Sequence, residues 1–146
     1  MAKKKDKKSK KDGKKKERGK AVSKKKKKKI QVQKATFYIK SSYNNTIISV
    51  ADQAGMVLTW SSPGVVGFTG SRKSTSYAAT RAAEDAVMKA QKFGVKQANV
   101  IIKGTGLGRQ AAVKGLRSAG LRITSLSDHT PLPHGGVSPR KKPRGS

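Results

Sequence analysis

The chain has 146 residues and a formal charge of +28, because 35 Lys and Arg residues stand against only 7 Asp and Glu residues. Such a charge opposes compaction and attracts polyanions, so the candidate partners are nucleic acid, an anionic membrane surface or a very acidic protein. Without cysteine the chain has neither a disulfide framework nor a thiolate zinc site, and no apolar run is long enough to span a bilayer.

Residues 1–29 are lysine-rich, hold more than half of the basic residues and contain almost no apolar side chains. They cannot bury enough apolar surface to offset the entropy of ordering, so we predict a disordered extension. No apolar stretch follows the basic start, so we expect no signal peptide and a soluble intracellular protein. The extension can serve as a solubilising or import tail or as a polycation that lies along phosphates, and the two roles are compatible.

A folded domain is predicted over residues 30–128, and it begins with strands. Alternating apolar residues and β-branched runs predict three of them, the last two joined by a hairpin turn at Asp52–Gly55. In chain order these strands cover residues 31–42, 44–52 and 56–60. The candidate inward positions on the first strand are Val32, Phe37 and Ile39.

A glycine-rich irregular loop over residues 61–74 leads into a predicted helix over 74–94. Ser74 or Ser76 can cap the start of this helix, and Gly94 suits the left-handed position just past its end. Small residues on one face would let the helix approach a sheet closely. That face consists of Ala79, Ala82, Ala83, Ala86, Ala90 and Phe93.

A strand over 95–103, a helix over 109–119 closed by Gly120 and a strand over 121–128 complete the domain. The order β-β-β-α-β-α-β implies antiparallel pairing early and parallel pairing late. We predict an α/β fold (mixed α+β): a mixed β-sheet packed by two helices and flanked by disordered basic tails. Residues 129–146 form the Pro/Gly-rich C-terminal tail. The inward positions of the last strand are Leu121, Ile123 and Leu126.

Three glycines, two positions apart, stand in the loop KGTGLGR, residues 103–109. A strand, a glycine loop, a helix and a strand ending at Asp128 are the parts of a dinucleotide-binding unit. That fingerprint requires glycine three positions after Gly106, where Arg109 stands. A Walker-type loop requires Lys followed by Ser or Thr, and Arg-Gln follows here. We therefore expect no nucleotide cofactor.

Two interpretations of this loop remain. Glycines let a backbone approach a ligand, and a helix N-terminus offers unpaired N–H groups to an anion. Lys103 and Arg109 flank the loop, so a phosphate of a nucleic-acid backbone is the simplest occupant. Alternatively, the segment is a tight strand-to-helix turn that binds nothing.

Catalytic residues are scarce. Glu84 and Asp85 diverge by about 100° on a helix, so we do not expect the carboxylates to converge on a metal pair. His129 and His134 lie at the start of the tail without a nucleophile elbow. We predict a protein that is not an enzyme, in which His134 contacts RNA. The four acidic residues of the domain are Asp52, Glu84, Asp85 and Asp128.

Most aromatic residues fall at predicted inward or capping positions, so we predict that they form core; Tyr43 and Phe68 lie in loops and are the exceptions. Recognition of RNA should then depend on phosphates and RNA shape more than on bases. The aromatic residues are Phe37, Tyr38, Tyr43, Trp60, Phe68, Tyr77 and Phe93.

Four motifs stand in order along the chain: SYNNTIISVAD, GFTGSRKST, KGTGLGR and GLRITSLSDHTPLPHGG, followed by a basic end. Over about residues 36–144 the chain resembles the bacterial form of small-ribosomal-subunit protein eleven. The resemblance implies a mixed α/β fold that bridges helices of the small-subunit (16S-type) ribosomal RNA on the platform and helps form the cleft for messenger RNA pairing.

The resemblance also implies partners and a site. The partners are ribosomal proteins seven and eighteen, with an interaction with initiation factor three. It implies no cofactor and no membrane. The RNA-facing positions carried over by motif are Asn44, Asn45, Gly70, Ser71, Arg72, Lys73, Ser74, Lys103, Gly104, Gly106, Gly108, Arg109, His134, Gly135, Arg140, Lys141, Lys142 and Arg144.

The chain departs from the family pattern at two motifs. The family commonly has KGPGPGR where Thr105 and Leu107 stand here, so the loop lacks proline stiffness. It commonly has PHNGC where Gly135, Gly136 and Val137 follow the histidine here, so any role of an Asn side chain or a thiol is absent. The lysine-rich start is longer than usual, and no family function extends to it.

Our hypothesis is a non-enzymatic constituent of a bacterial-type small ribosomal subunit, in the cytoplasm or an organelle. One alternative is a general nucleic-acid compactor of the chromatin type, which predicts equal affinity for duplex DNA and structured RNA. A second is a nucleotide-dependent enzyme, which predicts saturable binding of a dinucleotide to the isolated domain.

Overall fold

The computed structural model describes residues 31–142. The predicted extension over residues 1–29 and the predicted RNA contact Arg144 lie outside these residues. The described part contains β1 (Lys34–Ser41), β2 (Thr46–Ala51), β3 (Val57–Ser61), the 3-10 turn η1 (Gly70–Ser74), α1 (Ser76–Gln91), β4 (Gln97–Lys103), α2 (Gly108–Ser118) and β5 (Arg122–Asp128). The predicted order of strands and α-helices is confirmed.

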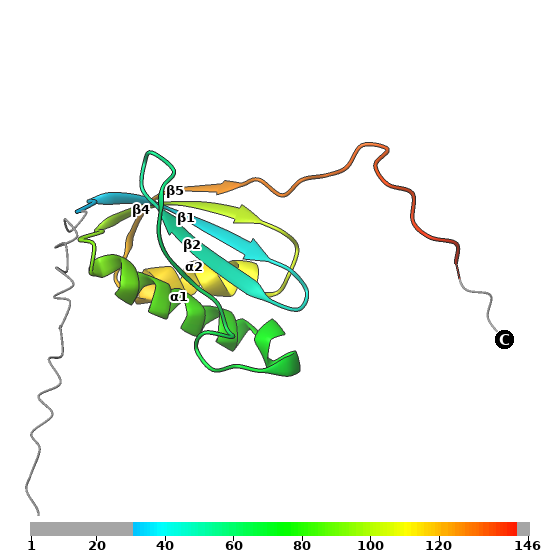
Figure 1. Ribbon diagram of the computed structural model, residues 1–146, viewed down its shortest axis with the longest axis horizontal. Helices are drawn as coiled ribbons and strands as arrows, with labels where there is room; N and C mark the ends of the chain where they lie inside the picture. The colour runs from blue at the N-terminus through cyan, green and yellow to red at the C-terminus, as the bar shows by residue number, and fades with distance from the viewer. Residues whose placement is uncertain (1–30, 143–146) are drawn as a thin grey trace, which may run out of the picture.

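The five strands form one mixed sheet in the order β3-β2-β1-β4-β5. β2 pairs antiparallel with β1 and with β3, while β4 pairs parallel with β1 and with β5. The predicted α+β class with both kinds of pairing is therefore confirmed. Figure 1 shows α1 and α2 on the same side of the sheet, so within residues 31–142 one face of the sheet is covered by helices and the other is open.

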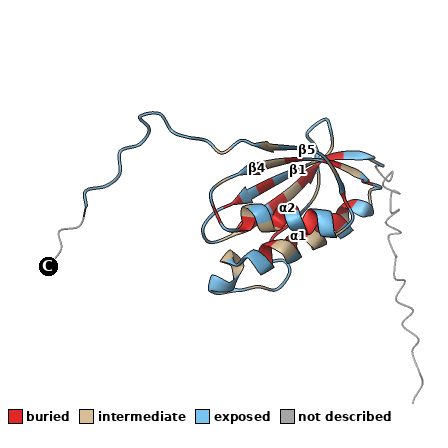
Figure 2. Ribbon diagram, turned by 180° about the vertical axis from the view of Figure 1, so that it is seen from behind, coloured by how far each residue is buried: buried red, intermediate tan, exposed pale blue. Residues whose placement is uncertain are grey.

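The core lies between the sheet and the helices (Figure 2). Side chains alternate between the faces of a strand, so every second residue of β1, β2 and β4 points toward the helices. Burying each large aliphatic or aromatic side chain stabilises the fold by about 1.5–3 kcal/mol. These buried strand residues include Phe37, Ile39, Ile48, Val50, Ala98, Val100 and Ile102.

The start of α1 differs from the prediction. Thr75 is the N-cap, because its Oγ1 accepts a hydrogen bond of 3.3 Å from the backbone N–H of Ala78. Neither Ser74 nor Ser76 has this role. Ser74 belongs to the 3-10 turn that precedes the helix, inside the segment predicted as irregular loop, and its hydroxyl donates to the carbonyl of Ser71.

The alanines of the predicted small-residue face of α1 are buried and pack against α2 as well as the sheet, while Phe93 lies past the end of the helix and is partly buried. At the crossing of the two helices, a Cβ atom on Gly115 would lie 2.9 Å from the carbonyl oxygen of Thr80 and 3.0 Å from the Cβ of Ala83. Glycine therefore lets the helices approach closely. Past the helix ends, Gly94 and Gly120 have φ angles of 83° and 81°, the left-handed conformation expected there.

Leu126 faces inward as predicted, but it is not buried. Leu126 pairs with the buried Val100 and so lies on the helix side of the sheet, yet it is 50% exposed. β5 is an edge strand, and α2 leaves a hollow beside it. Leu121 is buried and Ile123 is partly buried.

The prediction that most aromatic residues form core is wrong. Phe37 is fully buried, and Phe93 packs against the core. Tyr38, Trp60 and Tyr77 are 40%, 53% and 60% exposed. Tyr38 and Trp60 occupy outward positions, on the face of the sheet opposite to α1 and α2.

No helix among the described residues has the length and apolar character needed to cross a membrane.

Candidate nucleic-acid interface

Four of the predicted RNA-binding segments lie at one end of the molecule, on the right in Figure 1. β1, β4 and β5 all end there, and α1 and α2 both begin there. At the carboxyl ends of parallel strands, loops and helix N-termini lie together. Open α/β sheets commonly bind ligands at this edge. The segments are the β1–β2 turn (residues 42–45), η1, the β4–α2 loop (residues 103–109) and the start of the C-terminal tail (residues 129–142).

The glycines of the β4–α2 loop lie against the β1–β2 turn of the same chain. A Cβ atom on Gly104 would lie 2.0 Å from the carbonyl oxygen of Ser41, and one on Gly106 would lie 2.1 Å from that of Ser42. The N–H of Gly106 also donates to the carbonyl of Ser41 over 3.2 Å. The close approach that requires glycine is thus made to the chain itself, as the tight-turn interpretation expects.

Gly108 makes the third close approach. A Cβ atom there would lie 2.0 Å from the Oγ1 of Thr46, a buried hydroxyl that shares a hydrogen bond with the Oγ of Ser41. Packing therefore requires all three glycines. They hold two of the predicted RNA-binding segments side by side, and Lys103 remains exposed at the edge of the loop.

The β1–β2 turn uses one of its two asparagines for its own structure. The Oδ1 of Asn45 accepts from the backbone N–H of Thr46 over 2.9 Å, and the backbone N–H of Asn45 donates to the Oγ of Ser42 over 3.1 Å. Asn44 and Tyr43 are exposed at the tip of the turn. Asn44 is thus the asparagine whose side chain faces solvent.

Arg109 forms an ion pair with Asp128 at the end of β5. The same carboxylate accepts hydrogen bonds from the hydroxyl of Thr130 over 2.5 Å and from its backbone N–H over 3.0 Å. The hydroxyl of Thr130 in turn accepts from the N–H of Gly104 over 3.2 Å. These contacts join both ends of the β4–α2 loop to the first residues of the C-terminal tail.

This cluster lowers the pKa of Asp128. The side-chain hydroxyl of Thr130 contributes most, followed by its backbone N–H, and the charge of Arg109 adds to them. Asp128 therefore stays ionised at neutral pH and keeps Arg109 beside the loop. A guanidinium has five N–H donors, so Arg109 keeps donors for a phosphate while it is paired.

The η1 turn presents two cations next to the N-terminus of α1. Arg72 is exposed and donates to the Oγ1 of Thr69 over 3.0 Å, while Lys73 is half-buried. At the N-terminus of α2, Leu107 stands in the cap position and has no side-chain acceptor, so the first N–H groups of the helix receive no side-chain cap. Both helix starts present the positive end of the helix dipole to an anion.

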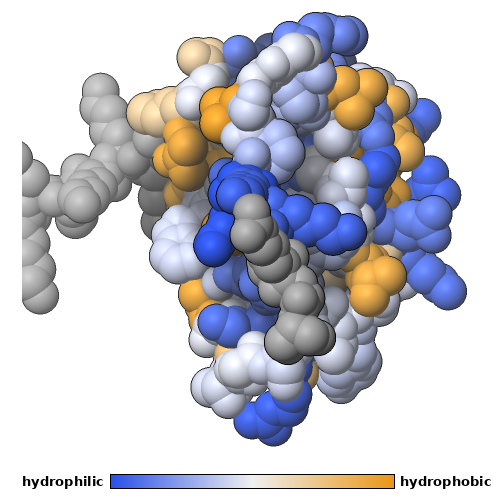
Figure 3. Space-filling view, turned by 90° about the vertical axis from the view of Figure 1, so that its right-hand side faces the viewer, coloured by the Kyte–Doolittle hydropathy of each residue, from blue (hydrophilic) through white to orange (hydrophobic). Residues whose placement is uncertain are grey.

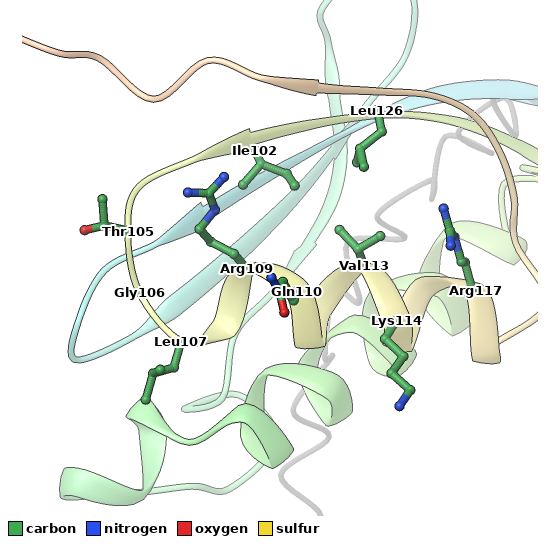
Figure 4. A pocket seen from close by; sticks show the side chains of 10 residues that line it. All are labelled: Ile102, Thr105, Gly106, Leu107, Arg109, Gln110, Val113, Lys114, Arg117 and Leu126. Carbon is green, nitrogen blue, oxygen red and sulfur yellow. The ribbon is translucent and has the colours of Figure 1, made fainter.

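A hollow of about 920 Å³ lies between α2 and β5 (Figure 4). Its apolar wall includes Leu126 and Val113, and Lys114 and Arg117 of α2 also line it, with Arg117 at the opposite end of the hollow from Arg109. Lys114 and Arg117 were not among the predicted RNA-binding residues. Lys114 follows Gln110 by about one helical turn, and Arg117 follows Arg109 by about two. This spacing places them on the same side of the helix, and it is the signal that could have found them.

The C-terminal tail leaves the body at the same end and extends away from it (Figure 1). Figure 3 views this end: hydrophilic side chains surround the base of the tail, with apolar patches toward the rim. The exposed residues of the tail that are predicted to contact RNA are His134, Gly135, Arg140, Lys141 and Lys142.

Comparison with known proteins gives a consistent result. A family model described as Ribosomal protein S11 matches residues 35–144. Small ribosomal subunit protein uS11 of Thermus thermophilus is 50% identical over 118 residues, which cover 81% of this chain and 92% of that protein. The uS11 proteins of Treponema pallidum and Chlamydia pneumoniae are 48% and 47% identical, over 85% and 84% of this chain and 98% and 92% of their own lengths.

Proposed function

The chain belongs to the ribosomal protein S11 family, and from this premise we propose that its basic end holds small-subunit ribosomal RNA through phosphate contacts. Membership gives the chain a structural, non-enzymatic role in the small ribosomal subunit, with ribosomal RNA and other ribosomal proteins around it. The proposal names the surface that makes the RNA contact.

The observation that carries the proposal is the gathering of cations and helix N-termini at one end of the fold. Arg72, Lys73, Lys103 and Arg109 come from segments far apart in sequence, and the basic tail leaves the body beside them. In a protein of net charge +28 such an arrangement attracts a polyanion. Phosphate contacts of this kind fix position and orientation on RNA without reading bases.

The family resemblance suggests where in the small subunit the chain lies and which molecules it contacts. We propose that the chain sits on the platform of the small subunit, bridges helices of the 16S-type RNA and helps shape the cleft for messenger RNA pairing. Separate basic segments on one end, together with a long tail, can reach more than one RNA helix. Ribosomal proteins seven and eighteen are the proposed protein neighbours, initiation factor three is a proposed transient partner, and the bacterial cytoplasm is the proposed location.

The test is binding of the full chain to small-subunit ribosomal RNA at a series of salt concentrations. If about ten phosphates are neutralised, the slope of log affinity against log salt is about −7 to −9. Replacing both Arg72 and Lys73 by Ala should reduce the steepness by about 0.7–0.9 for each lost contact. Arg81→Ala is the matched control, because Arg81 already pairs with Glu84 on α1 over 3.0 Å.

A slope near −2 would contradict the proposal. An equally large reduction of the slope in the Arg81→Ala variant would also contradict it. Competition with duplex DNA distinguishes the compactor alternative, because a small-subunit protein should prefer the structured ribosomal RNA over duplex DNA of equal length. Equal affinity for the two would favour the compactor.

A further inference from the structure

The face of the sheet that points away from the helices carries a row of side chains across four strands. In the pairing register, Trp60 of β3 lies opposite Ser49 of β2, Ser49 opposite Tyr38 of β1, and Tyr38 opposite Ile101 of β4. Paired residues point to the same face, so Trp60 and Tyr38 flank the small Ser49 on one surface. Both helices lie on the other side (Figure 1).

Aromatic and aliphatic surface on this face stays in contact with solvent. Trp60 is 53% exposed, and Tyr38 and Ile47 are each 40% exposed. Such side chains normally lose water contact when a domain folds, and a group of them on one face marks a site where something docks. Neither α1 nor α2 covers it.

The same face is basic. Lys34, Lys40 and Lys103 are exposed at outward positions, and Lys40 pairs with Lys103 in the parallel register of β1 and β4. Like charges opposite each other on neighbouring strands repel, so this pair costs stability until an anion lies between them. The acidic residues within residues 31–142 lie in other parts of the fold. Asp52 is in the β2–β3 turn, Glu84 and Asp85 are on α1, and Asp128 is at the end of β5.

We propose that this open sheet face binds unpaired nucleotides of RNA, with one base stacked on Trp60, one on Tyr38, and phosphates at Lys40 and Lys103. The proposal rests on the RNA-binding function above and adds a second, base-contacting surface to it. Aromatic rings on a sheet combined with cations are the general means by which proteins hold single-stranded nucleic acid.

The spacing of the two rings favours an unpaired strand. Trp60 and Tyr38 are two strands apart, which is about 10 Å across a sheet. That is far greater than the stacking distance inside a duplex, so two bases can occupy both rings only if they are splayed apart. The polar Ser49 between them leaves room for the linking sugar and phosphate.

Trp60 provides a direct signal, because it is the only tryptophan in the chain. The full chain is titrated with a single-stranded RNA of eight uridines and, in parallel, with an abasic oligonucleotide of the same length and charge. Stacking predicts that the uridine strand quenches Trp60 emission and that the abasic strand binds without quenching it.

Affinity for the same fluorescently labelled uridine strand is then measured by anisotropy. Loss of one stacked base predicts about 5- to 150-fold weaker binding for Trp60→Leu, with smaller losses for Trp60→Phe, which keeps a ring. Met88→Ala is the control, because Met88 is 58% exposed on α1 in the helix layer and should not change the affinity. Circular dichroism confirms that each variant folds.

Two results would overturn the proposal while leaving the RNA-binding function intact. One is tight binding of the uridine strand with no change in Trp60 emission and no effect of Trp60→Leu. The other is quenching caused by small-subunit proteins but not by RNA, which would make the face a protein-docking surface. Failure of the chain to bind ribosomal RNA at all would instead remove the proposed function itself.

Discussion

The backbone of Gly106 lies so close to the carbonyl of Ser42 that a Cβ atom on Gly106 would be 2.1 Å from that oxygen. The β4–α2 loop and the β1–β2 turn, which are far apart in sequence, therefore fit together only with glycine at this position. The contact explains why the loop needs glycines without any ligand, and it fixes the relative position of two segments of the proposed RNA surface.

Gly106→Ala should lower the free energy of unfolding by about 1–3 kcal/mol, because the neighbour it meets is backbone and cannot rotate away. Denaturant unfolding measures this change. Gly64→Ala is the matched control, since its added Cβ would have only the Oγ of Ser62 nearby, at 3.9 Å. An effect within about 0.5 kcal/mol is expected for the control; equal stability of the Gly106 variant and the wild type would refute the tight contact.

Gly108→Ala should also destabilise the protein, and here the obstacle is a side chain. The added Cβ would lie 2.0 Å from the Oγ1 of Thr46. Thr46→Ala removes that oxygen, so Gly108→Ala should cost less in the Thr46→Ala background than in the wild type. A double-mutant cycle measures the difference. Strict additivity of the two changes would mean that the clash is with something else.

Arg109 can act on RNA directly or by positioning the tail. A substitution at Asp128 distinguishes these two roles. Arg109→Ala removes both the cation and the ion pair, and we expect it to weaken binding of ribosomal RNA at low salt. Asp128→Asn breaks the ion pair but keeps the cation, so we expect affinity to stay the same or rise, because a negative charge is removed from the surface. If both variants lose affinity equally, Arg109 acts only by holding the tail.

Acid should weaken the contact between β3 and α1. Burial alone would raise the pKa of Asp85, but hydrogen bonds from Lys89 and from the buried Ser61 outweigh it and lower the pKa. The carboxylate lies 2.5 Å from the Nζ of Lys89 and 2.6 Å from the Oγ of Ser61. Because the folded pKa is below the unfolded value of about 3.9, the unfolded state binds the proton first. The stabilisation is thus complete well above the unfolded pKa and is lost progressively as the pH falls through that value toward the folded pKa.

Denaturant midpoints measured from neutral pH down to about pH 3 check this sign. Asp85→Asn should be less stable than the wild type at neutral pH and should lose less of its stability on acidification. Ser61→Ala, which removes one of the two donors, should fall between them. A wild type and an Asp85→Asn variant with the same pH dependence would show that this carboxylate does not contribute.

Local sequence signals were sufficient for most of the fold. Alternation in β1, β-branched residues in β2 and the turn after Asp52 predicted the antiparallel part of the sheet, and helices between later strands predicted the parallel part. Gly94 ends α1 as expected. The cap was misassigned by one residue, because Ser74, Thr75 and Ser76 can all cap a helix and only the geometry of the 3-10 turn selects Thr75.

The errors concern which surfaces are covered. Leu126 and Trp60 have the residue types of core positions, but Leu126 lies on an edge strand beside a hollow and Trp60 faces away from the helices. No local sequence pattern predicts which strand lies at the edge of the sheet or which face of the sheet the helices cover. For the same reason the loop glycines could be assigned to a turn or to a ligand, since the Ser41 and Ser42 carbonyls they meet are brought there only by the parallel pairing of β1 and β4.

The central claim is that this chain is held in the small ribosomal subunit by its RNA contacts. The most direct measurement is sedimentation of the tagged full chain in an extract of its own cells, at moderate and then at high salt. We predict co-migration with small-subunit particles at moderate salt and progressive release as salt rises. A chain that stays at the top of the gradient, apart from small-subunit particles even at low salt, would contradict the account.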